Sequence, residues 1–536
     1  MEINGFKLKY SIAELKEKVN EQMRKIELID ENNPAYTALS DGDKKALKYL
    51  ADAAKIMNNV ALEMDNPHNL AQKKALEEAA PTNEQAALTL KLFNSLNGVA
   101  GFNGIDKEPV ELFEDIKMQK GCNFYPAGLT AKELAQIISA MLDAGHENEV
   151  RKILSARTMV RRNGDFLKAI DFTEYFAKEF SEIANLLECA AHFADDDLFK
   201  DFLGWQAQAL LQNNEEMDIL ADKHWARMQV SPLEFTISRE NYEDKLTPTI
   251  FDNAELTNRL AKLNIAPVPK DMLGVRVGIV NKEGTTLLLK FKDEMTKLAG
   301  LMPKADSYTQ NIGGNSGLKQ TMVDVDLTVY HRQVRQSGDK EKTAQILNGL
   351  VDSELRQYYD EEADHLFTIG HENGHSLGPD SSYQTALGVY QHIIEEHKAN
   401  LISASMMPEY VKAGIISAEQ LKKIYATWVI KRHLMTAYPS SGEAHRVADL
   451  IEYNYLTAHN AIYFDKNKKL HIDFAKMPQV CRAMLEDIIS IQLSKSPKYA
   501  KAYIEKWTDW SEISQYVADF KLKLGVKPYI ELVTHF

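Results

Sequence analysis

Apolar side chains recur along most of this chain at intervals of three and four residues, which is the period of an amphipathic helix. The pattern extends over residues 15–26, 45–64, 134–154, 166–193, 344–368, 390–406 and 484–495. Glycine and proline, which interrupt helices, are scarce for this length, at 26 and 16 positions. The pattern therefore predicts a predominantly helical protein.

A few segments depart from the helical period. Residues 274–291 contain two β-rich runs around an Asn-Lys-Glu-Gly turn, which predicts a hairpin, and residues 321–330 partly alternate apolar and polar positions, which predicts another strand. Residues 94–109 and 302–317 are rich in Asn and Gly and predict loops, the second being the better candidate for a domain boundary. The expected fold class is mostly α with a small β element (α+β).

The composition is typical of a globular protein, and the net charge is negative. The 536 residues include 63 Lys or Arg and 77 Asp or Glu, for a net charge of −14, which argues against nucleic-acid binding. At about 150 residues per domain the length predicts two to four domains. No stretch approaches the ~18 apolar residues of a membrane span, and the N-terminal residues lack the apolar core of a signal peptide. We therefore expect a cytoplasmic protein without nucleic-acid or membrane partners.

The three cysteines limit the kind of metal site that the chain can form. Cys122, Cys189 and Cys481 are far apart and form no CxxC pair, which excludes a disulfide framework and a cysteine-based zinc site. Any metal would have to be held by His, Asp or Glu.

One short motif carries recognisable metal chemistry. Residues 371–375 read HENGH, which is an HExxH pattern. The expected number of chance occurrences of this pattern in a chain of this length and composition is about 0.03. On a helix, His371 and His375 lie on one face and can bind one ion, while Glu372 beside them can take a proton from a metal-bound water. The motif follows a periodic apolar segment, and a Gly-Pro pair just after it predicts the end of the helix.

A catalytic zinc ion needs a third protein ligand. The next periodic segment supplies Glu395 and Glu396, which follow His375 by 20 and 21 residues. Taken alone, this pair indicates a solvated helix face, but next to HExxH it indicates a ligand. Three other histidines lie near the motif in sequence and are interpreted as structural: His365, His392 and His397.

These residues resemble the dipeptidyl peptidase III family of zinc metallopeptidases. The resemblance rests on two patterns, His371-Glu372-x-x-His375-x-Leu377-Gly378-Pro379 and Glu395-Glu396-x-Lys398-Ala399. The five-residue motif followed by Gly-Pro is similar to that of a bacterial branch and of the related domain in plant Nudix-fused proteins. Further segments match the family in the same order, namely 123–126, 159–162, 240–244, 280–282 and 443–446. In the family the counterpart of residues 280–282 opens a helix, an alternative to the hairpin predicted above.

Position by position, the resemblance implies one Zn²⁺ per chain, bound by His371, His375 and Glu396. Glu372 would be the general base and then the proton donor. Glu395 would orient one of the motif histidines, as zinc ligands require.

The resemblance also implies residues that face the substrate. Tyr242 and His445 would stabilise the oxyanion that develops on the scissile carbonyl. Glu240 would bind the free N-terminal ammonium group of the substrate.

The implied fold consists of two lobes around a wide cleft, with the zinc on the helical lobe. We expect residues 1–255 to form mainly the lower lobe, with helices and part of a small β-barrel, and residues 256–335 to cross between the lobes. Residues 336–500 would form the mainly helical catalytic lobe, and residues 501–536 a C-terminal helical tail.

The predicted function is a zinc-dependent peptidase, a monomer or homodimer, that releases dipeptides from the free N-terminus of oligopeptides. Two departures from the family weaken dipeptide specificity more than zinc hydrolysis: residues 324–329 lack the asparagines of the family's Asn-rich segment, and a Gly-Pro pair is replaced around Ser238-Arg239. Two alternatives stay open. One is a zinc hydrolase or peptidase of other specificity, such as an aminopeptidase or an oligopeptidase, and the other is a non-catalytic zinc-binding interaction protein.

Overall fold

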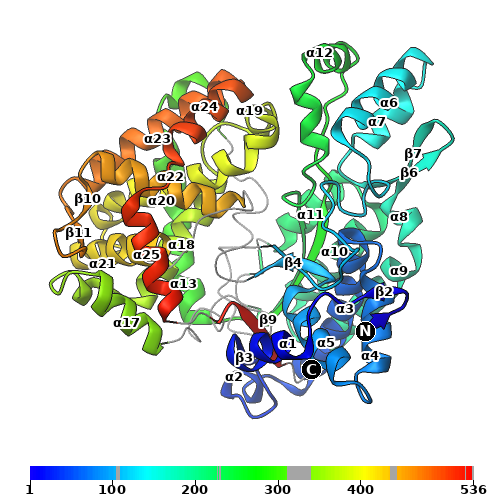
Figure 1. Ribbon diagram of the computed structural model, residues 1–536, viewed down its shortest axis with the longest axis horizontal. Coiled ribbons are helices and arrows are strands. Elements are labelled where there is room, and N and C mark those ends of the chain that lie inside the picture. The colour runs from blue at the N-terminus through cyan, green and yellow to red at the C-terminus, as the bar shows by residue number, and fades with distance from the viewer. Residues whose placement is uncertain are drawn as a thin grey trace.

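Two assemblies of helices stand side by side in the fold, as Figure 1 shows for a computed structural model of the chain. The structure describes residues 1–103, 109–225, 227–228, 231–310, 340–434, 443–524 and 527–533. The two largest clusters of buried side chains divide in the same way, one running from Ile29 to Val280 and the other from Leu288 to Val517. We call the assemblies around these clusters the N-terminal half and the C-terminal half.

The N-terminal half is organised around helix α9 (Ala177–Phe193), which packs between α3 (Asp41–Asp65) and α10 (Asp197–Gln212). Two antiparallel pairs accompany these helices, β6 (Thr158–Asn163) with β7 (Phe166–Asp171) and β8 (Leu233–Glu240) with β9 (Met272–Ile279). The remaining helices of this half are α2 (Pro34–Thr37), α6 (Ala131–Asp143), α7 (Glu147–Ile153), α8 (Phe172–Tyr175), α11 (Glu215–Trp225), η2 (Thr247–Asp252) and α12 (Ala254–Lys262).

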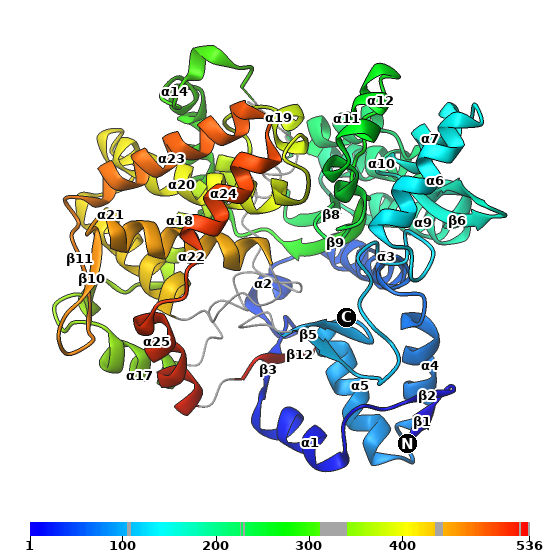
Figure 2. The ribbon, with the colours of Figure 1, turned by 45° about the horizontal axis from the view of Figure 1, so that its top comes forward.

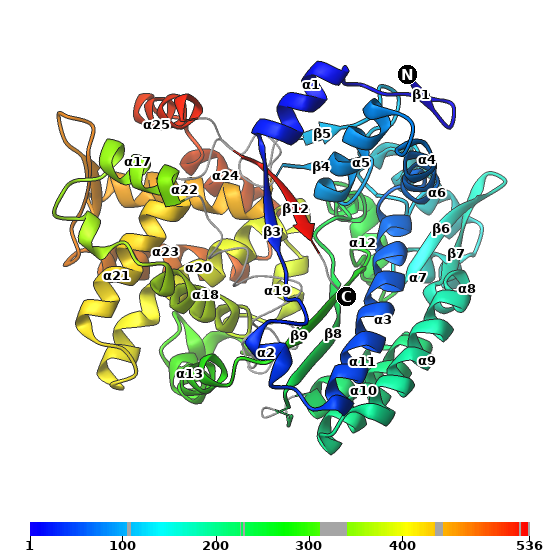
Figure 3. The ribbon, with the colours of Figure 1, turned by 90° about the horizontal axis from the view of Figure 1, so that it is seen from below.

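A third, smaller cluster of buried side chains lies near the N-terminus and includes Tyr529 from the end of the chain. Strand β3 (Met23–Glu27) pairs in parallel with β12 (Tyr529–Val533), so that the chain returns to its beginning, as Figure 3 shows from below. The other elements of this region are β1 (Glu2–Ile3), β2 (Phe6–Lys7), α1 (Ile12–Lys16), η1 (Glu17–Glu21), α4 (Asn69–Ala79), α5 (Glu84–Leu96), β4 (Ala100–Phe102) and β5 (Pro109–Glu111).

The C-terminal half surrounds helix α20 (Gln391–Lys412), which contacts α18 (Glu361–His375), α21 (Ala418–Trp428), α22 (Ala444–Ala458) and α23 (Met477–Ser494) (Figure 2). The other elements are α13 (Lys282–Asp293), α14 (Met295–Gly300), η3 (Ala305–Ser307), α17 (Lys340–Leu350), η4 (Arg356–Tyr358), α19 (Ser381–Thr385), η5 (Gly388–Tyr390), η6 (Val429–Leu434), β10 (Ile462–Phe464), β11 (Leu470–Ile472), α24 (Pro497–Trp507) and α25 (Glu512–Lys523).

Helix α20 is unusual because it buries polar side chains. Glu396, His397 and Lys398 are completely buried, and Asn400 nearly so. Buried polar groups destabilise a fold unless they find partners. Helix α20 therefore carries a buried polar network within the hydrophobic core of this half.

The hairpin predicted over residues 274–291 is wrong. The first run is strand β9, but its partner is β8, with Leu233 opposite Ile279, and the second run is helix α13. Leu288 and Phe291 on that helix are buried in the core of the C-terminal half, so packing of one helix face outweighs the β propensity of the segment. The helix implied by the family resemblance is the correct reading here.

Two of the predicted helical segments also contain a strand. Residues 15–26 divide between α1, η1 and β3, and residues 166–193 begin with β7 before α9. Both strands are fixed by pairing with another segment, which helical periodicity does not report. The strand predicted at 321–330 and residues 324–329 lie outside the described residues, as do parts of the predicted loops 94–109 and 302–317.

The predicted fold class, mostly α with a small β element, is confirmed. Every sheet in the described part of the chain has only two strands. A search of the described residues for a helix long and apolar enough to cross a bilayer finds none.

Candidate metal centre

Helix α18 carries the HENGH motif in its last turns. It begins after Asp360, which caps it, and the chain leaves the helical path just beyond His375, where Gly378 adopts a φ of +93° that favours glycine. Because they are one turn apart, His371 and His375 leave the helix on the same face. That face lies against α20.

Two glycines let α18 and α20 approach closely. A Cβ added at Gly374 would lie 2.8 Å from the carbonyl oxygen of Ala399 and 3.0 Å from its Cα. One turn earlier, a Cβ on Gly370 would meet Ser403, whose Oγ donates a hydrogen bond to the carbonyl of Phe367 at 2.8 Å. These contacts set the separation of the two helices.

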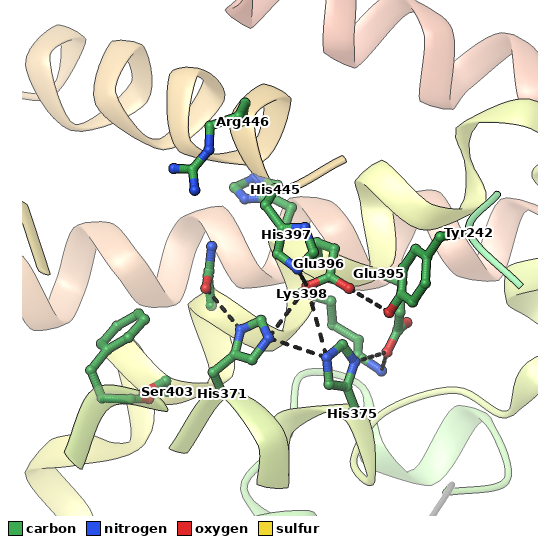
Figure 4. A network of polar contacts seen from close by, with 12 residues as sticks. Tyr242, His371, His375, Glu395, Glu396, His397, Lys398, Ser403, His445 and Arg446 are labelled. Carbon is green, nitrogen blue, oxygen red and sulfur yellow. Dashed lines mark hydrogen bonds and ion pairs between the residues drawn. The ribbon is translucent and has the colours of Figure 1, made fainter. Parts of the chain in front are cut away.

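Three side chains converge between the helices, as Figure 4 shows: the ligand atoms of His371, His375 and Glu396 all lie within 4.8 Å of one another. Nε2 of His371 lies 3.2 Å from Nε2 of His375. Oε2 of Glu396 lies 3.3 Å from the first nitrogen and 3.8 Å from the second. Donors bound to tetrahedral zinc at 2.0–2.1 Å would be about 3.3–3.4 Å apart, so the spacing suits such an ion.

Each imidazole is oriented through its other nitrogen. Nδ1 of His371 lies 2.8 Å from Oδ1 of Asn400, and Nδ1 of His375 lies 3.1 Å from Oε1 of Glu395. Because both oxygens accept, both Nδ1 atoms carry the hydrogen when the rings are neutral. In that state the two Nε2 lone pairs face each other at 3.2 Å, an arrangement that a cation bound between them would stabilise.

Glu395 is itself held in place by two further groups. Its Oε1 pairs with the buried ammonium group of Lys398 at 2.8 Å, and its Oε2 accepts a hydrogen bond from Gln492 at 3.3 Å. Burial acts to raise the pKa of Glu395, but Lys398 and His375 outweigh it and lower that pKa below its ordinary value. The structure thus places Glu395 where the sequence predicted it, as an ionised carboxylate that orients a histidine.

Asn400 is oriented by a buried carboxyl group. Its Nδ2 donates to Oε1 of Glu452 at 2.9 Å, and the same oxygen lies 3.0 Å from Nδ1 of His397. Sequence reasoning missed Asn400, although its position one turn after Glu396 is a usable signal. It also missed Glu452, which lies on α22 and has no local signal.

Tyr242 reaches this group from the N-terminal half. It follows β8 directly, and its Oη donates to Oε1 of Glu396 at 2.6 Å (Figure 4). Burial and the negative charge of Glu396 raise the pKa of Tyr242 well above its ordinary value, so the phenol keeps its proton. The hydrogen bond joins the two halves of the molecule at the candidate centre.

His445 approaches from the first turn of α22. Its Nε2 lies 3.1 Å from Oε2 of Glu396, and its Nδ1 lies 2.6 Å from Oε1 of Glu443, the N-cap of that helix. Partial burial lowers the pKa of His445, but the carboxylates of Glu396 and Glu443 outweigh it and raise the pKa to about 10. The ring is therefore a donor at both nitrogens. Sequence reasoning assigned no role to Glu443.

Two further carboxyl groups lie close to these residues. Glu372 is half-buried on α18, and its negative charge acts on His375. Glu240, the last residue of β8, is accessible but recessed. Loss of hydration and the charge of Glu372 raise its pKa, while Arg276 acts in the opposite direction. All the predicted site residues are therefore brought together in one region.

The residues present fit a divalent cation. Glu396 is completely buried, and its Oε2 lies 3.3 Å from Nε2 of His371 and 3.1 Å from Nε2 of His445. Burial acts to raise its pKa, but His445 and His375 outweigh it and hold the pKa well below the ordinary value, so the group is a carboxylate. Two imidazoles and one carboxylate are a donor set found in catalytic zinc sites.

The close approach of the helices leads to a testable prediction at Gly374. The variant Gly374→Ala should lower the free energy of unfolding by about 1–3 kcal/mol, because the added methyl group overpacks against the backbone of Ala399. It should also weaken zinc binding, since the ligands come from the two helices that would be forced apart. Urea unfolding and a competitive zinc titration measure the two effects.

A matched control comes from Gly204 within α10, where an added Cβ meets nothing within 4 Å. Gly204→Ala should raise the free energy of unfolding by up to about 1 kcal/mol, because Ala favours the helix over Gly. A stabilised Gly374→Ala variant with unchanged zinc affinity would contradict the packing argument.

Comparison with known proteins gives likenesses in both sequence and structure. No family profile matches the chain. Nudix hydrolase 3 of Arabidopsis thaliana is 22% identical over 555 residues, which cover 88% of this chain and 68% of that protein. The structure of DPP III from Caldithrix abyssi superposes with a TM-score of 0.72 at 21% identity, covering 97% of this chain and 98% of that one. The dipeptidyl-peptidase III from Corallococcus sp. strain EGB superposes with a TM-score of 0.79 at 19% identity, covering 98% and 97%.

At these identities the comparisons show the fold. The chain shares the fold of the two dipeptidyl peptidase III structures over nearly its whole length. The resemblance stated from the motifs points to the same family, and the assignment to the branch with the Nudix-fused proteins stays a prediction.

Proposed function

We propose that this chain is a zinc-dependent peptidase that cleaves oligopeptides near their free N-terminus and releases dipeptides. One observation carries the proposal: the two Nε2 atoms of His371 and His375, 3.2 Å apart, face each other beside the buried carboxylate of Glu396. The shared fold with two dipeptidyl peptidase III structures supports it.

His371, His375 and Glu396 would hold the ion and leave its fourth position open. When bound, zinc supplies a Lewis acid that lowers the pKa of a water molecule to about 7 and polarises a carbonyl oxygen. Asn400 and Glu395 keep the hydrogens of the two imidazoles on Nδ1, so that both rings are neutral ligands.

Glu372 would perform the proton transfers. Its carboxylate accepts a proton from the attacking water and then returns it to the nitrogen of the leaving amine. Its place on α18, between two ligands and not among them, allows it to reach a water at the centre without occupying a coordination position.

Tyr242 and His445 would stabilise the negative charge that develops on the scissile carbonyl oxygen. Each is a hydrogen-bond donor directed at the metal group, from opposite halves of the molecule. Donors preorganised in a water-poor site stabilise a transition state much more than they would in water.

Glu240 would bind the free ammonium group of the substrate. It ends β8 two residues before Tyr242, and its charge acts together with that of Glu372. An ammonium group held at a fixed distance from the reacting carbonyl would restrict cleavage to the second peptide bond. Oligopeptides are therefore the expected partners, and the cytoplasmic location and the monomeric or dimeric state remain predictions.

The deciding experiment uses one heptapeptide with a free N-terminus and the same peptide with an acetylated N-terminus. Purified protein of measured zinc content should release a dipeptide from the free peptide and nothing from the blocked one. Single amino acids or internal fragments would favour the alternative of an aminopeptidase or oligopeptidase. Zinc binding without hydrolysis would favour the non-catalytic alternative, and protein that binds no zinc would contradict the proposal.

A further inference from the structure

Tyr242 makes a hydrogen bond to the metal group across the boundary between the two halves. It belongs to the segment after β8, whereas the metal group lies on α18 and α20. A hydrogen bond from Oη to Glu396 fixes the end of the side chain, and the ring lies 6.2 Å, centroid to centroid, from that of His445. A closer contact on the ring would define the position of the hydroxyl group further.

His392 provides this contact. Its imidazole lies against the ring of Tyr242, with centroids 4.6 Å apart and planes inclined by 42°. His392 thus packs directly against the ring of Tyr242.

The spacing along α20 explains why both contacts reach one side chain. His392 and Glu396 are four residues apart and lie on the same face of the helix. The first turn of α20 presents the imidazole to the ring, and the next turn presents the carboxylate to the hydroxyl group. Just before this helix, Gly388 packs against Phe251 of η2, which seats the beginning of α20 on the N-terminal half.

The state of the imidazole agrees with a positional role. Burial lowers the pKa of His392 to about 4 although Glu396 acts to raise it, so the ring stays neutral at physiological pH. Its Nε2 has no hydrogen-bond partner among the described residues. The ring therefore acts through its face, not as an acid or base of the reaction.

We propose that His392 is a positioning residue that fixes the hydroxyl group of Tyr242 at the metal centre by packing against its ring. This inference deepens the proposed function, on which its kinetic part rests. It departs from the interpretation of His392 as a structural histidine, and the signal in the sequence is its spacing of four residues from Glu396.

The kinetic test is a double-mutant cycle of His392→Ala and Tyr242→Phe at saturating zinc. His392→Ala should lower kcat by about 10- to 100-fold with KM within about twofold, because a donor displaced by about 1 Å is lost mainly in the transition state. In the Tyr242→Phe background, His392→Ala should lower kcat by less than about threefold, because the hydroxyl group is already absent. Equal losses in both backgrounds would overturn the proposal.

Two further variants separate positioning from general damage. His392→Phe keeps an aromatic face and should restore kcat to within about fivefold of the wild type. His471→Ala is the matched control, because His471 stacks on Tyr463 with centroids 4.9 Å apart in the hairpin of β10 and β11. Losing that imidazole–tyrosine pair should leave kcat and KM unchanged, and a loss equal to that of His392→Ala would overturn the proposal.

A structural readout decides the matter even if the chain cleaves no peptide. Crystal structures of the zinc-loaded wild type and of His392→Ala should show the hydroxyl group of Tyr242 within hydrogen-bond distance of Glu396 only in the wild type. An unmoved Tyr242 in the variant would overturn the proposal. If the wild type is inactive but Tyr242 moves when His392 is replaced, the proposed peptidase function is refuted and the positioning role of His392 is supported.

Discussion

Glu372→Gln is expected to keep its zinc and its fold but to lose peptidase activity, with kcat falling by about 10²- to 10⁴-fold. Glutamine has the shape of glutamate but cannot accept a proton from water at neutral pH. Glu372 lies outside the group of ligand atoms formed by His371, His375 and Glu396, so the ion should stay in place. Steady-state kinetics on the heptapeptide with a free N-terminus measures the loss of kcat. Zinc content measured on the same samples shows whether the ion is retained.

The matched control is Glu362→Gln, which removes an exposed carboxylate from the first turn of the same helix. It should change neither kcat nor zinc content. Glu372→Gln with full activity would refute the assignment of the general base. A zinc-free Glu372→Gln would mean that the residue is needed for binding the ion and not for proton transfer alone.

Glu396→Gln is expected to abolish stable zinc binding. The carboxylate is completely buried, and its Oε2 lies within 3.8 Å of both motif imidazoles. Loss of a group that merely supports a ligand weakens metal binding by about 10- to 100-fold, so loss of the charged ligand itself should exceed 100-fold. Because a bound ligand stabilises the folded state, zinc should raise the melting temperature of the wild type and leave that of the variant unchanged.

Glu409→Gln serves as the control on the same helix. Glu409 lies three turns and more beyond the site and pairs with Lys412 at 2.6 Å near the surface. Its loss should leave zinc affinity unchanged, since ion pairs of this kind contribute about 0–1 kcal/mol. If the Glu396→Gln variant retained wild-type zinc affinity, the metal would have to be held by other residues, and the proposed mechanism would fail with it.

The positions of the candidate metal ligands could be predicted because they depend on local spacing. His371 and His375 are one helical turn apart, and the pair Glu395-Glu396 lies on the next periodic segment. Which of the two glutamates faces the imidazoles is not a matter of spacing. The resemblance to a known family selected Glu396, and the structure agrees, with Glu395 turned toward Nδ1 of His375.

Other local predictions failed where a distant segment competed with local propensity. Residues 282–293 have β-rich character in isolation, but Leu288 and Phe291 find a core to pack against as a helix. Strand β3 exists because β12, at the other end of the chain, pairs with it in parallel. No periodicity within a short window contains that information, since the partner lies outside the window.

The sequence by itself determined that this is a predominantly helical protein, with an HExxH helix followed by a helix that carries the pair Glu395-Glu396. Both follow from the repeat of the α-helix, which places residues four apart on one face. Only the tertiary structure decided which side chains complete the centre: Glu452 behind Asn400, Glu443 behind His445, and His392 against Tyr242. These partners come from elements far apart in the chain. The orientation and the pKa of a buried polar group depend on the neighbouring groups that tertiary packing places around it.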